Sequence, residues 1–264
     1  MQSSPAVRVR LEKAAADNGF DLGLAPQGDW LAFASSHAPL RLWLTAYGET
    51  VLIAALSQAN VLLALEDQGL SFPCPLPGGA YGALGATDFA ELHRLLHRAF
   101  QLSRTLPDEL FRTFEEQTAA LPRATEAERL VVQRVGQDIF RGGLLEYWEG
   151  CCAITGLAVP ELLRASHIKP WAACELDSER LDVFNGFLLA PQLDAAFDSG
   201  LITVSDAGAV VVSDALDAEA RSLLGLDLTL CIRRLDDAHL RYLAWHRERI
   251  FRQDLRGGRA LKAQ

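Results

Sequence analysis

The sequence predicts an α+β protein in which a mixed strand-and-helix domain precedes a domain with strands and flanking helices. Apolar, aromatic-rich runs within residues 28–66 are typical of neighbouring strands. A polar, proline-bordered helical stretch at 106–125 places a domain boundary near residue 120. Short strand patterns return between residues 162 and 213, together with a helix. We therefore expect domains at residues 1–120 and 123–264.

The first domain should contain at least three strands and a long loop. "VLLALEDQG" fits either a fourth strand or a short helix, and "YGET" supplies a turn. Residues 71–88 are rich in proline and glycine, which predicts a loop. The expected strands are "DWLAFASS" at 29–36, "LRLWLTAYG" at 40–48 and "TVLIAAL" at 50–56.

A helix is predicted to follow this loop. Thr87 or Asp88 can cap its first turn, and Glu91 completes a capping box. Its apolar residues share one face, while the opposite face carries basic and polar side chains that include Arg94 and Arg98. That face is simply solvated, or contacts the phosphates of a nucleic acid, or holds a metal ion through His93 and His97, which are four residues apart.

Helices should flank the core of the second domain, which we expect at residues 150–215. Residues 126–148 are helical in pattern, with a break expected at Gly142-Gly143. Residues 236–252 form an amphipathic segment whose arginines face outward.

Charge is unevenly distributed along the chain. The net charge is −9, but residues 232–264 hold 9 basic and 4 acidic side chains, and residues 123–231 hold 8 and 17. An acidic middle is expected where carboxylates face a cation, and a basic end suits nucleic acid. Neither a signal peptide nor a run near the roughly 18 apolar residues of a membrane span is present, so we expect a cytoplasmic protein without a membrane partner.

Polar residues interrupt the second domain where its strands end. "LLRASHIKPW" is strand-like up to Ile168 and places His167 at the strand's end. Asn185 precedes a second strand, "GFLLA", and Pro191 suits the first turn of a helix. Asp194 and Asp198 are four residues apart, which puts both carboxylates on one face of that helix.

This order resembles the HNH endonucleases, a family with a ββα-metal core. The matching pieces are "CAITG", "SHIKPW", Asn185, "LDAAFD" and "GLI", and the similarity covers roughly residues 137–215. The resemblance implies that His167 is the general base and that Asn185 ties down the loop between the strands. It also implies that Asp194 and Asp198 bind a metal ion, with Arg164 or Lys169 holding phosphate.

Two positions depart from the generic family pattern. Asp194 stands where the third motif residue is usually histidine, and Ser166 precedes the base where many relatives carry an acid or a histidine. Both changes remove nitrogen ligands, so we expect Mg²⁺ or Mn²⁺, which prefer oxygen, over zinc or nickel. Gln192 is a further candidate near the metal.

The leading hypothesis is therefore a metal-dependent DNA endonuclease of restriction or defence type, with a homodimer as the candidate assembly. Residues 1–120 would recognise the target or a partner, aided by Arg94 and Arg98, and the basic C-terminal helix would bind DNA without sequence preference. Two alternatives stay open: a DNA-binding module whose catalytic site has degenerated, and a nuclease directed at RNA.

Overall fold

The chain forms two compact units, Met1–Glu109 and Leu110–Gln264, here called the N-terminal and C-terminal units. The division falls inside helix α4 (Pro107–Thr118), and the boundary expected near residue 120 lies just beyond the other end of that helix. The computed structural model describes residues 4–47, 51–65, 69–122, 124–226 and 228–253.

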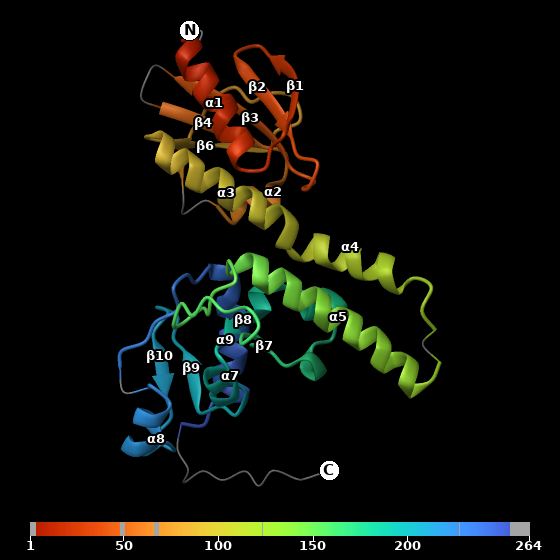
Figure 1. Ribbon diagram of the computed structural model, residues 1–264, viewed down its shortest axis with the longest axis vertical. Coiled ribbons are helices and arrows are strands. Elements are labelled where there is room, and N and C mark those ends of the chain that lie inside the picture. The colour runs from red at the N-terminus through yellow and green to blue at the C-terminus, as the bar shows by residue number, and fades with distance from the viewer. Residues whose placement is uncertain (1–3, 48–50, 66–68, 123, 227, 254–264) are drawn as a thin grey trace. The chain divides into compact units, whose positions relative to one another are not determined.

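An antiparallel sheet of six strands forms the N-terminal unit, in the order β1-β2-β3-β4-β6-β5 (Figure 1). The three strands expected between residues 28 and 56 are confirmed as β2, β3 and β4. Their apolar side chains are largely buried, which accounts for the strength of the sequence pattern. The strands are β1 (Leu22–Gln27), β2 (Trp30–Ala34), β3 (Arg41–Tyr47), β4 (Val51–Leu56), β5 (Leu70–Ser71) and β6 (Gly82–Ala86).

Two helices, α1 (Pro5–Asp17) and α3 (Phe89–Thr105), pack against each other and against this sheet. The start of α3 is as predicted, because the carboxylate of Asp88 accepts a hydrogen bond of 2.7 Å from the Glu91 amide. The sheet also contributes a cluster of buried apolar residues that includes Trp43 and Ile53. The partly buried side chains of Phe72 and Cys74 pack against this cluster.

Three features of the N-terminal unit differ from the sequence prediction or extend it. The predicted loop at 71–88 contains strand β6, which pairs with β4. Glycine lets the Leu62 side chain pack closely on this strand, since a Cβ at Gly82 would lie 2.3 Å from Leu62 Cδ2. The undecided segment after β4 begins as a short helix, α2 (Ala59–Leu63), while the turn expected at "YGET" lies mostly outside the described residues. Helix α1 and strand β1 had no predicted counterpart.

A long helix, α5 (Glu126–Tyr147), opens the core of the C-terminal unit. Thr125 and Glu128 form a capping box at its start. The break predicted at Gly142-Gly143 is wrong, because the helix continues through both residues. Gly143 is needed for close packing: a Cβ there would lie 2.6 Å from Leu110 and 3.2 Å from Val183.

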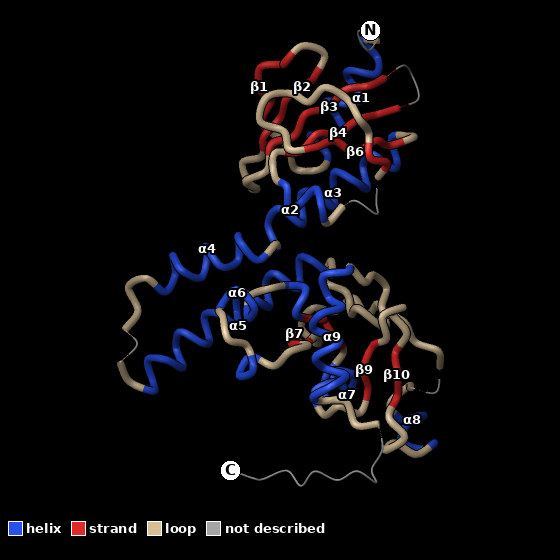
Figure 2. Tube along the Cα trace, turned by 180° about the vertical axis from the view of Figure 1, so that it is seen from behind, coloured by secondary structure: helices blue, strands red, loops and turns tan. Residues whose placement is uncertain are grey.

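A two-stranded antiparallel sheet, β7 (Arg164–His167) with β8 (Gly186–Leu189), lies between α5 and α7 (Pro191–Asp198) (Figure 2). The mixed α+β class and the strand–strand–helix order are confirmed. The segment joining the two strands contains three short helical turns. These are η2 (Trp171–Ala173), α6 (Asp177–Arg180) and η3 (Val183–Asn185).

A second hairpin and two helices complete the C-terminal unit. Strands β9 (Ile202–Val204) and β10 (Val210–Val212) pair antiparallel, as the pattern of residues 201–213 predicts. Helix α8 (Ala218–Leu223) follows, and α9 (Asp237–Arg249) packs against β9 and η3. No helix in the described ranges combines the length and apolarity needed to cross a membrane.

Candidate active site

His167 ends strand β7 and is held by aromatic rings on two sides. Phe140 of α5 stacks on the imidazole, with ring centroids 3.8 Å apart and planes 17° from parallel. Trp171 meets it edge-on at 5.7 Å. Gly186, the strand partner of His167, makes this packing possible, because a Cβ at that position would lie 2.4 Å from Phe140.

The two ring nitrogens of His167 have different surroundings. Nε2 lies 2.8 Å from the backbone carbonyl oxygen of Arg180. A carbonyl oxygen can only accept, so Nε2 carries the proton and Nδ1 presents a lone pair in the neutral ring. Burial lowers the pKa of His167 to about 4, although the carbonyl contact works in the opposite direction. At neutral pH the side chain is therefore an uncharged proton acceptor.

Asn185 is completely buried and binds the segment that follows β7. Its side-chain oxygen accepts a hydrogen bond of 2.8 Å from the Lys169 amide. Its Nδ2 donates to the carbonyl oxygens of Lys169 and Glu179, at 3.2 and 3.0 Å. Because Glu179 adjoins Arg180, these bonds also fix the backbone that orients His167.

Helix α9 binds the same segment through contacts with Asp182, a residue of that segment that is 1% exposed. The Asp182 carboxylate accepts hydrogen bonds from the Tyr242 hydroxyl at 2.8 Å and from the Arg241 guanidinium at 2.6 Å. It also accepts the Phe184 amide at 2.9 Å and so caps η3, the turn that ends at Asn185. The C-terminal helix thus supports the position of Asn185.

Asp194 and Asp198 lie on one face of α7, next to Ser166 of β7. The Ser166 hydroxyl donates to Asp198 at 3.2 Å and also interacts with Asp194. Burial raises the pKa of Asp194, and burial together with the neighbouring Asp194 charge raises the pKa of Asp198. Two carboxylates that oppose each other's ionisation are stabilised by a cation between them.

This donor set fits a hard divalent cation. Mg²⁺ is commonly held by one or two carboxylates, with water and substrate phosphate completing its shell. Over the described part of the chain, no group of three or more His, Cys, Asp or Glu side chains could hold a metal ion. Asp194 and Asp198 supply two neighbouring carboxylates of that kind.

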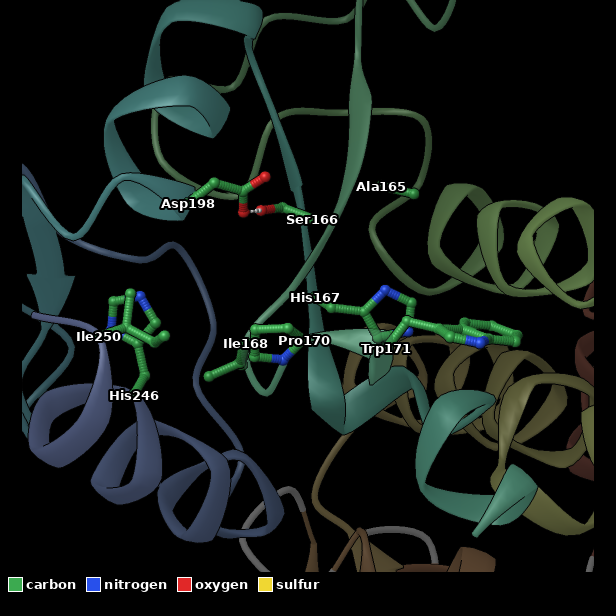
Figure 3. Close-up of a pocket in the computed structure, with 9 residues that line it drawn as sticks. All are labelled: Ala165, Ser166, His167, Ile168, Pro170, Trp171, Asp198, His246 and Ile250. Atoms are coloured by element: carbon green, nitrogen blue, oxygen red, sulfur yellow. Dashed lines mark hydrogen bonds between the residues drawn. The ribbon is translucent and has the colours of Figure 1, made fainter. Parts of the chain in front are cut away.

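His167 and Asp198 face one pocket of about 360 Å³ (Figure 3). Figure 3 shows the Ser166 hydroxyl directed at the Asp198 carboxylate, with His246 and Ile250 of the α9 region on the side away from Trp171. In Figure 3 the His167 ring extends toward Trp171, and the Ser166 and Asp198 side chains lie on the other side of the strand that carries His167. The residues that line the pocket are Ala165, Ser166, His167, Ile168, Pro170, Trp171, Asp198, His246 and Ile250.

The cationic residues expected to hold phosphate have different environments. Arg164 is exposed and acts electrostatically on Asp194. The Lys169 ammonium pairs with Glu179, 3.0 Å from each carboxylate oxygen. In the N-terminal unit Arg94 is exposed, but Arg98 is only 4% exposed, so its expected place on an exposed basic face is wrong. A 3.5 Å contact with Gln101, itself buried, accompanies that burial.

Sequence reasoning missed several residues that shape the site. Phe140, Asp182 and His246 come from segments distant in sequence from His167, and the Arg180 contribution is a backbone carbonyl with no sequence signature. His246 is a satisfied core histidine, bonded to Thr203 and to the Phe197 carbonyl. The residue pattern of 236–252 predicted an amphipathic helix. It did not predict the elements against which that helix packs.

The fold and the site form a ββα unit: two antiparallel strands, a histidine at the end of the first, and a helix with acidic residues after the second. Residues 152–205 match the family described as HNH endonuclease. This segment of the C-terminal unit is therefore similar to HNH endonuclease domains, as the sequence motifs predict. No curated protein matches the chain.

Proposed function

We propose that the protein is a metal-dependent endonuclease that hydrolyses phosphodiester bonds in DNA. One observation carries the proposal. His167 uses one ring nitrogen to bind the Arg180 carbonyl, and it lines the same pocket as Asp198 within the HNH-family segment. A neutral imidazole and a carboxylate that line one pocket can supply a general base and a cation ligand for the hydrolysis of a phosphodiester.

His167 acts as the general base in this proposal. Its Nδ1 accepts a proton from the attacking water, while the Arg180 carbonyl keeps Nε2–H in place and stabilises the imidazolium that forms. Asn185 is a positioning residue, because it orders the backbone around Lys169 and Glu179 without facing the pocket.

Asp194 and Asp198 would hold the cation, with Ser166 orienting Asp198. A bound Mg²⁺ or Mn²⁺ supplies Lewis acidity to the scissile phosphate and stabilises the departing oxyanion. Arg164 is the stronger phosphate-binding candidate, since Lys169 is already paired with Glu179. Gln192, exposed at the start of α7, is not among the residues that line the pocket.

The N-terminal unit, residues 1–109, is proposed to select the target or a partner. Exposed Arg94 would contact DNA, and Arg98 is the weaker candidate because it is buried. Restriction or defence is the biological setting that the family resemblance suggests. Cutting both strands with one site per chain would require two copies or two successive events.

A second candidate is a DNA-binding module that retains the fold without cleaving. Ser166 and the pKa of about 4 at His167 favour it, because a hydroxyl is a weak metal ligand and such an imidazole is a weak base. The two candidates make opposite predictions for cleavage under the same conditions.

A plasmid assay tests the proposal. Supercoiled DNA incubated with the protein and Mg²⁺ or Mn²⁺ should become nicked, and a chelator should stop the reaction. A His37→Ala variant, which alters an exposed histidine of the N-terminal unit, should cut like the wild type. Metal-dependent binding without nicking would establish the non-catalytic module, and preferential cleavage of a matched RNA would redirect the assignment to RNA.

A further inference from the structure

The chain leaves α9 and crosses the end of α7 in a short segment, Ile250–Arg252, called here the C-terminal strap. The Arg252 amide donates a hydrogen bond of 2.9 Å to the Gly200 carbonyl oxygen, and the Ser213 hydroxyl donates to the Arg252 carbonyl. Gly200 has a φ of +70°, and a Cβ there would lie 2.2 Å from the Ile250 carbonyl oxygen. The contact thus depends on glycine at this position.

The strap lies at the edge of the candidate active site. Gly200, its attachment point, comes two residues after Asp198. Ile250 lines the same pocket as His167 and Asp198 (Figure 3). The end of the described chain is therefore anchored where a phosphodiester backbone would approach the carboxylates.

Arg252 attaches through main-chain atoms alone, and its side chain is exposed. Within the ranges that the structure describes, its guanidinium forms no ion pair or hydrogen bond. Arg249 is also exposed, at 64%, and its one ion pair with a described residue is to the adjacent Glu248 at 3.4 Å, a contact of little strength in water. Arg247, by contrast, is occupied by the Val204 carbonyl at 2.8 Å and by Asp206 at 2.6 Å.

We propose that Arg252 and Arg249 bind the phosphate backbone of duplex DNA beside the scissile bond, so that the C-terminal strap forms part of the nuclease site. The inference rests on the proposed DNA cleavage and adds the residues that hold the substrate. Asp194 and Asp198 place negative charge where DNA must approach, and nearby cations are needed to offset it. Arginine matches phosphate geometry through paired N–H donors.

Salt-dependent binding measures these contacts without requiring cleavage. Fluorescence anisotropy would follow a labelled duplex binding to the full chain in a His167→Gln background at several salt concentrations. Each lost phosphate contact reduces the slope of log K against log salt by about 0.9, which is roughly five- to tenfold in affinity near 0.1 M salt. Arg252→Gln and Arg249→Gln should each show this loss, and Arg129→Gln, at an exposed site on α5, should not.

Gly200→Ala provides an independent variant, because it displaces the strap without removing an arginine. It should reduce the salt slope as Arg252→Gln does. Unchanged slopes in both arginine variants would overturn the inference, as would the absence of DNA binding by the parent protein. If the wild type cuts DNA while the slopes stay equal, the strap proposal fails alone; if the slopes fall but no DNA is cut, the nuclease proposal fails alone.

Discussion

The Nε2–H group of His167 donates a 2.8 Å hydrogen bond to the carbonyl oxygen of Arg180. His167 ends β7, and Arg180 ends α6 within the segment that joins β7 and β8, so the bond links the ring to the fold of that segment. Replacing the histidine therefore tests a structural role and the proposed catalytic role, which suitable substitutions separate.

We predict that His167→Gln keeps the structural contact and loses cleavage. Glutamine retains an amide donor at the depth of Nε2 but cannot accept a proton from water. The rate should fall by on the order of 10²–10⁴, the usual contribution of a positioned base. The melting temperature should drop less than in His167→Ala, which also loses the stacking on Phe140. Cleavage at the wild-type rate by His167→Gln would remove His167 from the mechanism.

Sequence reasoning predicted the parts of the site that follow one another along the chain. The strand ending at His167, the turn at Asn185 and the spacing of Asp194 and Asp198 are local patterns, and the structure contains the corresponding elements. The ring of Phe140 on His167 and the Asp182–Tyr242 bond join positions 27 and 60 residues apart, and no local pattern encodes them.

The misassigned elements share a physical cause. Strand β6 is made of glycine, alanine and one leucine, so it lacks the bulky alternation from which strands are recognised, yet β4 and β5 pair with it. The Gly142-Gly143 pair predicted a helix break from its low helix propensity. The helix continues because the absence of a side chain at Gly143 allows close packing against Leu110. In both cases tertiary contacts outweigh intrinsic propensity.

We predict that Asp198→Asn weakens metal binding without destabilising the metal-free protein. The amide oxygen can still accept from Ser166, while the repulsion that raises the pKa of Asp198 next to Asp194 disappears. The melting temperature in chelator should therefore stay equal or rise. Mg²⁺ or Mn²⁺ affinity, measured by calorimetry, should fall by at least the roughly 10–100-fold typical of losing an outer-shell partner.

Ser166→Ala tests whether the Ser166 hydroxyl orients the Asp198 carboxylate, because this variant removes the hydroxyl and keeps both carboxylates. It should reduce metal affinity less than Asp198→Asn does. Identical calorimetric traces for wild type, Asp198→Asn and Asp194→Asn would show that these carboxylates do not hold the ion.

We predict that Asn185→Ala lowers stability and leaves metal affinity unchanged. The substitution strands the Lys169 amide and two carbonyl groups in the interior, and each unsatisfied group costs roughly 1–3 kcal/mol. Urea unfolding gives the loss of stability, and calorimetry gives the metal affinity. Asn60→Ala, at an exposed asparagine of the N-terminal unit, serves as the control. Lost metal binding with normal stability would instead make Asn185 a metal ligand.

Acid should destabilise the C-terminal unit through His246. Burial lowers the pKa of His246 to about 4, against 6.5 for the free side chain, so the unfolded chain binds a proton first as pH falls. Stability is then fully present above pH 6.5 and is lost between 6.5 and about 4, by roughly 3 kcal/mol. Urea unfolding across that window should show a shallower dependence in His246→Gln. Equal dependence in both proteins would show that His246 titrates normally.

Exposed Arg94 should contribute to DNA binding from the N-terminal unit, whereas buried Arg98 should not. The C-terminal unit has an acidic pair at its site, so an exposed cation of the N-terminal unit can add to the phosphate contacts proposed for Arg249 and Arg252. Arg94→Glu should therefore weaken binding to duplex DNA and reduce the salt slope by about 0.9 or more. Arg8→Glu makes the same charge change on α1 and therefore serves as the control for position. Arg98→Glu would place a carboxylate in the interior, so it would test folding and not DNA binding. If Arg94→Glu and Arg8→Glu bind DNA alike, α3 is not a DNA-contacting helix, and the N-terminal unit has another task, such as binding a protein partner.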